Sequence, residues 1–297
     1  ILFEGGNFIS TGTCEMPYVL SGEIKNYEDI VFFNEESFNE KKKVKVFTNH
    51  FVKEIDRKNK SITVLDKKAN KELGFTYDKL ILTTGSKPNE LNEIPFSIEN
   101  VFSYKSVQDY LDIRNYIKNN KVKDILIVGS GYIGLELADA LNQAKFNITL
   151  LEQYDLPMPS AEEEVRHLVK SLLDKNNINF LNSSDKTKFI KNDNKFTQLK
   201  NEGRYLGFDL AIITAGIKPN NDIALNAKLK LGNFGGLTVD TRLRTSDPNI
   251  YAAGDNIEIT NFITRRNDYF PLATYAHEFG HISGENAAGG NKIIKPL

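Results

Sequence analysis

The sequence predicts an α/β fold with parallel sheets, and three observations support this. Four continuous apolar runs end in a small residue and a glycine, amphipathic segments lie between them, and a glycine-rich turn follows one run. The runs are Tyr77–Gly85, Asp124–Gly129, Asp209–Gly216 and Asn249–Asp255. Uninterrupted apolar strands are typical of parallel sheets that are covered on both faces. Because ligands bind at the carboxyl ends of such strands, these four ends are candidate sites.

Length and composition indicate an ordinary globular protein. The 297 residues suit two domains better than one, and 40% of them are hydrophobic and 26% charged. A net charge of -1 gives no reason to expect nucleic acid or an anionic membrane as a partner. No apolar stretch reaches the ~18 residues of a membrane span. The lack of a targeting signal and the presence of a free thiol predict a cytoplasmic protein.

Periodicity predicts the remaining elements. Apolar residues three or four apart predict helices at Tyr104–Asn119, Ile133–Lys145 and Glu162–Asn176. Alternating polar and apolar residues predict short antiparallel strands. These are Val44–Phe47, Val52–Ile55 and Ser61–Leu65, with smaller meander strands at Phe189–Ile190 and Phe196–Leu199.

The run Gly129-Ser130-Gly131-Tyr132-Ile133-Gly134 matches the pattern G-x-G-x-x-G. Such a match is common by chance, but here a strand precedes it and an amphipathic helix follows. The three glycines, Gly129, Gly131 and Gly134, then serve a tight turn, close approach of the pyrophosphate and close helix–strand packing. The free N–H groups of the helix N-terminus attract phosphate. A glycine turn without a ligand is the alternative.

Glu152 ends the next predicted strand, Asn147–Leu151, about twenty residues beyond the turn. A carboxylate at that place accepts hydrogen bonds from the adenine ribose hydroxyls of a dinucleotide. A 2′-phosphate there would meet a like charge. The sequence therefore favours NADH over NADPH.

Cys14 is the single cysteine, so an internal disulfide and a Cys-rich zinc site are excluded, and no metal site is predicted. A lone cysteine is most often a small buried hydrophobic residue. Pro17 and Gly22 predict a short helix that begins just after Cys14. The helix dipole would lower the thiol pKa, whereas the neighbouring Glu15 would raise it.

Several motifs now occur together in one order. They are Glu4, Thr13-Cys14-x-x-Pro17-Tyr18, Thr84–Pro88, Gly129–Glu136, Thr214–Asn220 and Tyr251–Asp255. Together they resemble the single-cysteine flavoprotein disulfide reductases, the group that contains coenzyme A disulfide reductase, NADH oxidase, NADH peroxidase and persulfide reductase. The resemblance covers essentially the whole chain.

The resemblance implies two Rossmann-like dinucleotide-binding domains, each with a small antiparallel meander. The NAD(P)H domain, residues 104–224, would be inserted between the two parts of an FAD domain, residues 1–103 and 225–297. It also implies that Cys14 lies beside the flavin and cycles between a thiolate and a mixed disulfide, persulfide or sulfenic acid. This implication replaces the buried interpretation of Cys14.

The resemblance also assigns the cofactor contacts. Glu4 would bind the FAD ribose, Asp255 the ribityl chain, and Leu272-Ala273-Thr274 would form the helix N-terminus aimed at the flavin pyrimidine ring. Thr84, Gly85, Gly216 and Gly254 complete the implied cofactor-binding set. Tyr132 would gate the nicotinamide pocket and Glu136 would lie close to the flavin, although ordinary helix packing remains open for both. Asp255 has the alternative of a simple turn residue.

The chain departs from the family pattern at several places. The first strand, glycine turn and helix of the FAD domain and the C-terminal dimerisation domain have no counterpart, so the sequence is interpreted as a fragment of a homodimeric protein. Glu15 stands where a glycine is usual, and His281 where an arginine is usual. His277 and His281 lack the intervening glutamate of H-E-x-x-H, so solvent-facing or interface histidines are favoured over a metal pair.

The resulting hypothesis is an oxidoreductase that passes electrons from NADH through FAD to Cys14. Without a second cysteine, the resolving thiol must come from a small substrate, such as coenzyme A disulfide or a persulfide. Reduction of oxygen or peroxide through a sulfenic acid is the enzymatic alternative. A nicotinamide-binding module without turnover and an electron-transfer partner with a structural Cys14 are the alternatives from other classes. Neither nucleic acid nor membrane is expected as a partner.

Overall fold

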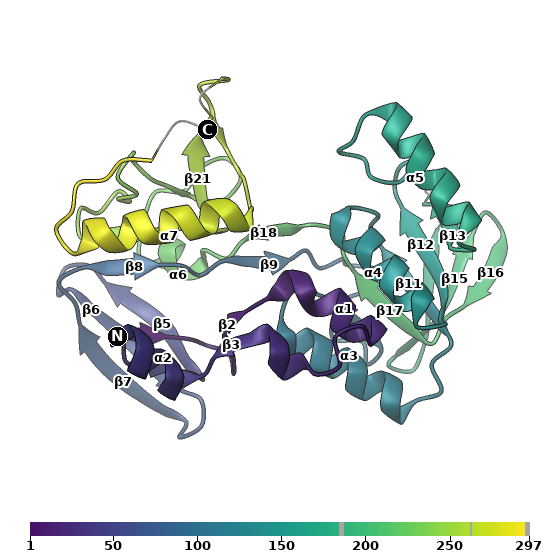
Figure 1. The fold of residues 1–297 in the computed structure, drawn as a ribbon, viewed down its shortest axis with the longest axis horizontal. Coiled ribbons are helices and arrows are strands. Elements are labelled where there is room, and N and C mark those ends of the chain that lie inside the picture. The colour runs from purple at the N-terminus through teal and green to yellow at the C-terminus, as the bar shows by residue number, and fades with distance from the viewer. Residues whose placement is uncertain (184–186, 262, 295–297) are drawn as a thin grey trace. The chain divides into compact units, whose positions relative to one another are not determined.

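The computed structural model describes residues 1–183, 187–261 and 263–294, and the chain forms two compact units (Figure 1). Unit 1 contains residues 1–7, 35–87 and 217–297, and unit 2 contains residues 8–34 and 88–216. Both contain parallel strands, so the predicted α/β class is confirmed. Residues 8–34 pack with unit 2, whereas the sequence analysis assigned them to the FAD domain. The cofactor-based division into residues 1–103, 104–224 and 225–297 stays a prediction.

The centre of unit 2 is a five-stranded parallel sheet. Its order is β10 (Val101–Ser103), β17 (Leu210–Ile213), β11 (Asp124–Val128), β12 (Asn147–Glu152) and β13 (Asn179–Asn182). Helices α4 (Tyr132–Gln143) and α5 (Glu163–Lys175) follow β11 and β12, and α3 (Val107–Asn119) follows β10. All three helices lie within a few residues of the predicted ranges.

The core of unit 2 follows from the alternation of side chains along β11. Ile125 and Ile127 face a cluster with residues of α3 and α4, whereas Leu126 and Val128 face a second cluster. Successive strand residues point to opposite faces, so a continuous apolar run serves two cores. The second cluster includes Phe196 and Leu199 of the antiparallel meander β14 (Lys188–Asn192), β15 (Lys195–Asn201) and β16 (Arg204–Gly207).

The segment 8–34 attaches to unit 2 through its own apolar side chains. Strands β2 (Ile9–Thr11) and β3 (Val31–Phe33) pair, and between them lie the 3-10 helix η1 (Thr13–Glu15), helix α1 (Met16–Ser21) and the 3-10 helix η2 (Tyr27–Ile30). Met16, Val19 and Ile30 are buried in the cluster that contains residues of α3 and α4. Gly22, with φ 86°, ends α1 as predicted.

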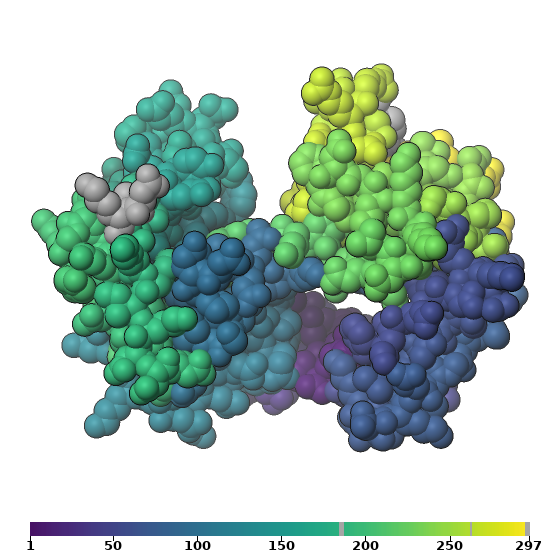
Figure 2. Space-filling model, turned by 180° about the vertical axis from the view of Figure 1, so that it is seen from behind, coloured from purple at the N-terminus to yellow at the C-terminus, as the bar shows by residue number. Residues whose placement is uncertain are grey.

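Unit 1 joins segments that are far apart in the sequence. Strands β8 (Leu80–Leu82) and β20 (Ile250–Ala252) pair in parallel. Strands β5 (His50–Asp56), β6 (Ser61–Asp66) and β7 (Lys71–Thr76) form an antiparallel meander, in which β5 and β6 overlap predicted strands and β7 was not predicted. Figure 2 shows the blue and green segments of this unit lying against each other. The other elements are β9 (Ser86–Pro88), β18 (Ile217–Pro219), α6 (Asp222–Asn226), β19 (Leu237–Thr238), β21 (Ile257–Thr260), β22 (Asn267–Asp268) and α7 (Ala273–Ala287).

One predicted strand has the wrong orientation. β4 (Val46–Phe47), expected as an antiparallel strand, pairs in parallel with β1 (Leu2–Phe3). In the sequence, helix α2 (Glu35–Lys42) belongs to the long connection between β1 and β4 and directly precedes β4. Parallel pairing requires such a crossover connection, which the alternation of a few residues does not reveal.

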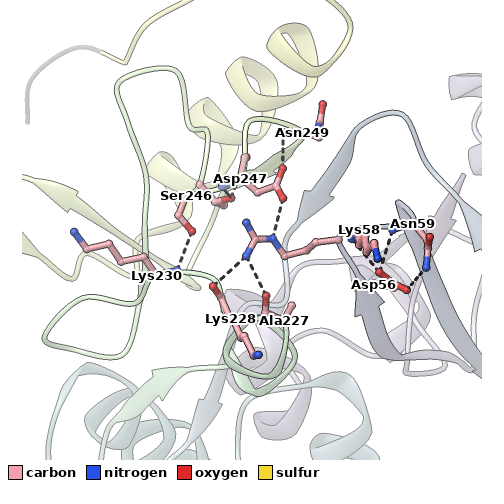
Figure 3. Close-up of polar contacts among 11 residues, drawn as sticks. Asp56, Lys58, Asn59, Ala227, Lys228, Lys230, Ser246, Asp247 and Asn249 are labelled. Carbon is pink, nitrogen blue, oxygen red and sulfur yellow. Dashed lines mark hydrogen bonds and ion pairs between the residues drawn. The ribbon is translucent and has the colours of Figure 1, made fainter.

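A partly buried ion pair connects the meander of unit 1 to two loops. The Nε of Arg57 lies 2.8 Å from Oδ2 of Asp247, and its Nη1 donates to the carbonyl oxygens of Ala227 and Lys228 (Figure 3). The other carboxylate oxygen of Asp247 accepts from the N–H of Asn249. Burial alone raises the pKa of Asp247, but the hydrogen bonds and the Arg57 charge outweigh it and lower the pKa below its usual value.

This ion pair makes stability depend on pH. Because the pKa of Asp247 is lower in the folded state, its contribution is present above the unfolded pKa of ~3.9 and is lost as the pH falls through the folded value. We expect Asp247→Asn to reduce the free energy of unfolding by about 1–3 kcal/mol at pH 7, and the difference from the wild type to shrink below about pH 4. Urea unfolding across this pH range measures it. A difference that stays constant down to pH 3 would contradict the assignment.

Candidate active site

The glycine turn of unit 2 lies at the carboxyl edge of the parallel sheet. Gly129 has φ 105°, and a Cβ there would lie 2.6 Å from the carbonyl oxygen of Thr214. A Cβ on Gly134 would collide with the carbonyl oxygen of Gly129 and lie 2.7 Å from the Thr214 hydroxyl. That hydroxyl donates to the carbonyl oxygens of Val128 and Gly129. Two of the three glycines are therefore required by the packing of helix and strands.

Gly131 differs, because no atom lies within 4 Å of a Cβ placed on it. It is the N-cap residue of α4, and among the described residues no side chain caps this helix. The space at Gly131 and the uncapped N–H groups of a three-turn helix suit an anion that approaches the backbone. Tyr132, the first residue of α4, is 68% exposed beside this space.

Glu152 ends β12 next to the glycine turn, and its side chain is buried there. One carboxylate oxygen accepts from the N–H of Ser130 at 2.9 Å and from its hydroxyl at 2.7 Å, and the other accepts from the N–H of Gln153 at 2.8 Å. Glu152 is 7% exposed. A carboxylate has about four acceptor positions, of which these bonds use three, so one position remains for a ligand hydroxyl.

Helix α1 places a tyrosine against α4, the helix that follows the glycine turn. The Tyr18 hydroxyl donates to Oε1 of Glu136 across 3.4 Å. The negative charge of Glu136 is the main cause of a raised pKa for Tyr18. Tyr104, buried in the same unit, has a hydroxyl without a hydrogen-bond partner among the described residues, and burial raises its pKa. Glu136 therefore lies among phenols that stay protonated at neutral pH.

Cys14 is exposed, which excludes the interpretation as a buried core residue. It lies in η1, immediately before α1, and Met16 and Val19 anchor that helix in the core of unit 2. The carboxylate of Glu15 folds back over Gly12, where a Cβ would clash with it. The thiol is thus accessible on a segment whose neighbours are firmly packed.

Unit 1 has a second edge of the same kind. The carboxyl ends of β8 and β20 lie side by side, so the turns Thr84–Gly85 and Gly254–Asp255 meet. Gly85 and Gly254 have φ of 66° and 92°, the left-handed conformation that favours glycine. The Ser86 hydroxyl donates to Oδ2 of Asp255 at 2.8 Å and so connects the two turns.

Three asparagines hold this edge in place, of which Asn221 and Asn256 are buried and Asn220 is partly buried. The Asn256 amide donates to the carbonyl oxygen of Leu82, and the Asn221 amide donates to that of Asn256. The Asn220 amide donates to the carbonyl oxygen of Thr84. These bonds fix the backbone that presents Asp255.

The residues of this edge fit a large polar cofactor such as FAD. The hydroxyls of Thr84 and Tyr269 are buried and have no hydrogen-bond partner among the described residues. Unpaired buried hydroxyls are rare in native proteins, and such a group marks a place where a ligand or water completes the bonding. Leu272 is the N-cap residue of the 15-residue helix α7, and Ala273 and Thr274 are its first two residues; all three are exposed, and α7 carries no side-chain cap within the described residues.

The remaining predicted cofactor residues occupy turns. Glu4 follows β1, and its Oε1 accepts from the N–H of Gly6 at 2.6 Å. Gly216 follows β17 with φ 85°, and its carbonyl oxygen accepts from the N–H of Asn89. The roles of both residues in cofactor binding stay predictions.

Neither a metal centre nor a membrane helix was found in the described ranges. His277 and His281 stack edge to face with ring centroids 4.7 Å apart, and both are exposed. No group of three metal-ligating side chains includes them or any other described residue. None of the described helices is long and apolar enough to cross a bilayer.

The family model for pyridine nucleotide-disulphide oxidoreductases matches residues 1–280. The chain belongs to the pyridine nucleotide-disulphide oxidoreductase family. This membership confirms the family inferred from the ordered motifs. The family is FAD-dependent, and solved relatives bind NADH or NADPH.

Two curated oxidoreductases of this family resemble the chain over nearly its whole length. An NADH oxidase from Methanocaldococcus jannaschii is 31% identical over 290 residues, which cover 97% of this chain and 64% of that protein. A coenzyme A disulfide reductase from Staphylococcus aureus is 29% identical over 296 residues, which cover 99% of this chain and 65% of that protein. The chain thus spans just under two thirds of the length of these relatives.

Solved structures show the same fold. An NAD-dependent persulfide reductase from A. fulgidus has a TM-score of 0.92 and 29% identity, with 99% of this chain and 55% of that chain covered. The water-forming NADH oxidase of Lactobacillus brevis bound to NADH has a TM-score of 0.86 and 27% identity, with 99% and 63% covered. Its engineered form, an NADPH oxidase bound to NADPH, has a TM-score of 0.87 and 26% identity, with 99% and 64% covered.

Several residues of the candidate sites were not singled out from the sequence. Ser130 binds Glu152, Thr214 closes the glycine turn, Tyr18 binds Glu136, and Ser86 and Tyr269 lie at Asp255. Ser130, Thr214, Tyr18 and Ser86 lie inside the quoted motifs, so their place beside motif residues was a usable signal. Tyr269 lies in no motif and carries no such signal.

Proposed function

We propose that this chain provides the FAD and nicotinamide sites of an enzyme that passes electrons from NADH through FAD to Cys14, which reduces a small disulfide or persulfide such as coenzyme A disulfide. One observation carries the proposal. The single cysteine is exposed and lies on a segment anchored against the helix that follows the glycine turn. A structural cysteine would be expected inside the core.

The chemistry at Cys14 needs no second protein thiol. Its thiolate attacks a disulfide RS–SR, so that a Cys14–S–S–R bond forms and RS⁻ leaves and takes up a proton. Two electrons then cleave this mixed disulfide, which restores the Cys14 thiolate and releases a second RS⁻ that is protonated to the thiol. Bound FAD would accept a hydride from NADH and pass its two electrons to sulfur. The balance is NADH, one proton and RSSR converted into NAD⁺ and two RSH.

Reduction of oxygen is the second candidate, because the relative from M. jannaschii is named an NADH oxidase. In that case Cys14 would cycle through a sulfenic acid instead of a mixed disulfide. NADH consumption by the full-length protein with coenzyme A disulfide, polysulfide, oxygen or peroxide separates the two. Faster turnover with coenzyme A disulfide or polysulfide supports the proposal, and turnover with oxygen or peroxide alone would overturn it. We further propose that the full-length protein is a homodimer located in the cytoplasm.

The preference for NADH rests on Glu152. The engineered oxidase that binds NADPH carries a glycine-to-alanine and an aspartate-to-alanine substitution, among others, at the spacing that separates Gly134 from Glu152 here. Removal of an acidic residue thus accompanies NADPH use in that relative. Glu152 retains the carboxylate, which favours ribose hydroxyls and disfavours a 2′-phosphate.

We expect Glu152→Ala to lower the ratio of kcat/KM for NADH to that for NADPH by at least about tenfold, because a hydrogen bond to a charged group and a like-charge repulsion are lost together. Steady-state kinetics with both cofactors measure the ratio. Ser130→Ala is the matched control, because it removes one bond of Glu152 but keeps the carboxylate, and it should weaken both cofactors alike. An unchanged ratio in Glu152→Ala would remove the role of Glu152.

A further inference from the structure

We propose that Tyr269 and Ser86 belong to the flavin site, with Ser86 orienting the Asp255 carboxylate and the Tyr269 hydroxyl donating a hydrogen bond to an acceptor atom of the bound cofactor. This inference rests on the proposed function and adds two residues of this chain to its flavin site. Neither residue was assigned a role from the sequence.

Ser86 fixes the position of Asp255. Its hydroxyl donates to Oδ2 of Asp255 at 2.8 Å, although 169 positions separate the two residues in sequence. Both backbones are held at the same sheet edge by the parallel pairing of β8 with β20. A carboxylate that accepts a hydrogen bond from a fixed donor is held in one orientation.

Tyr269 brings a hydroxyl to the same place. Its oxygen is buried and has no hydrogen-bond partner among the described residues, whereas the rest of the side chain is partly exposed. Burial, with the nearby charge of Asp255, raises the pKa of Tyr269 to about 12, although the neighbouring Ser86 hydroxyl acts in the opposite direction and lowers it. The phenol is therefore a neutral donor at physiological pH and carries a proton that it can direct at an acceptor.

An unpaired hydroxyl beside Asp255 carries a free-energy penalty, which a ligand that accepts its hydrogen bond can remove. A buried donor without an acceptor loses its bonds to water and gains none in return. The Thr84 hydroxyl, at the neighbouring turn, is unpaired in the same way within the described residues. Two such groups beside a candidate cofactor carboxylate indicate a site built for polar atoms that come from a ligand.

The test is Tyr269→Phe in the full-length protein, which removes only the hydroxyl. We expect the Kd for FAD to rise roughly 3- to 10-fold, the size of one hydrogen bond. The Tm of the FAD-free protein should stay unchanged or rise, because an unpaired group is removed, while the increase in Tm on adding FAD should shrink. A merely structural tyrosine would lower the Tm of the FAD-free protein instead.

Tyr251→Phe is the matched control, because the Tyr251 hydroxyl is also buried in unit 1 but donates to the carbonyl oxygen of Asn286. It should lower the Tm with and without FAD and leave the Kd unchanged. A Tyr269→Phe protein that binds FAD as tightly as the wild type would overturn the inference alone. A wild-type protein that binds no FAD would overturn the proposed function and the inference together.

Discussion

Replacing Cys14 by serine is expected to lower the NADH-dependent reduction of coenzyme A disulfide or polysulfide by roughly 10³-fold or more, the size typical of losing a nucleophile. A serine hydroxyl is not ionised at neutral pH and cannot form a disulfide with the substrate. The exposed position of Cys14 makes the substitution structurally mild, because no core contact of the thiol is lost. Thiol release from the substrate in the presence of NADH measures the effect.

A folding defect must be separated from a chemical one. The Tm and the Kd for NADH of Cys14→Ser should match those of the wild type, because the glycine turn and the core of unit 2 do not involve the thiol. Full disulfide reduction by the serine variant would assign Cys14 a structural role and favour the electron-transfer alternative. Loss of activity together with a lowered Tm would call for Cys14→Ala, which should show the same loss at an unchanged Tm.

Glu258→Ala should produce the largest loss of stability in unit 1. Glu258 is fully buried, and one oxygen accepts from the N–H groups of Phe234 and Gly236. Its second oxygen has no partner within the described residues. Alanine leaves the buried N–H of Gly236 and the part-buried N–H of Phe234 unpaired. An unpaired buried donor costs about 1–3 kcal/mol and a part-buried one less, so the free energy of unfolding should fall by about 2–4 kcal/mol.

The same variant should also weaken the proposed flavin site. The loop that Glu258 holds includes Gly235, whose carbonyl oxygen accepts from the Asn221 amide, and Asn221 also binds the backbone of Asn256 beside Asp255. Glu258→Gln is the control, because its amide oxygen can still accept from both N–H groups and the loss should be much smaller. Urea unfolding of the wild type, Glu258→Gln and Glu258→Ala measures the free energy of unfolding, which should decrease in that order. Equal stability of the alanine and wild-type proteins would show that the carboxylate does not hold the loop.

Local patterns in the sequence predicted much of the fold. The apolar runs at Asp124–Val128 and Leu210–Ile213 were predicted to be buried strands of a parallel sheet, and they are parallel strands with a core on each side. The glycine turn was predicted from the G-x-G-x-x-G pattern between a strand and a helix, and the structure supplies steric reasons for glycine at Gly129 and Gly134. A local sequence pattern predicts a helix, strand or turn when the interactions that determine that element involve residues close together in the sequence.

Long-range pairings could not be predicted in this way. Ser86 with Asp255 and Arg57 with Asp247 join residues that are 169 and 190 positions apart, and no spacing rule connects them. The two-residue strand β4 was misassigned because so short a segment does not specify its partner. The attachment of residues 8–34 to unit 2 depends on Met16 and Val19 meeting side chains of α3 and α4, which only the folded surfaces define.

The most direct measurement of the electron route is the mass of the peptide that contains Cys14. The full-length protein turns over coenzyme A disulfide without oxygen under limiting NADH, and acid followed by alkylation stops the reaction and blocks free thiols before the peptide is isolated. Capture of the substrate thiol by Cys14 predicts a fraction of this peptide that carries one coenzyme A moiety, and excess NADH should return it to the free thiol. A Cys14 peptide that stays unmodified while the substrate is consumed would contradict the account.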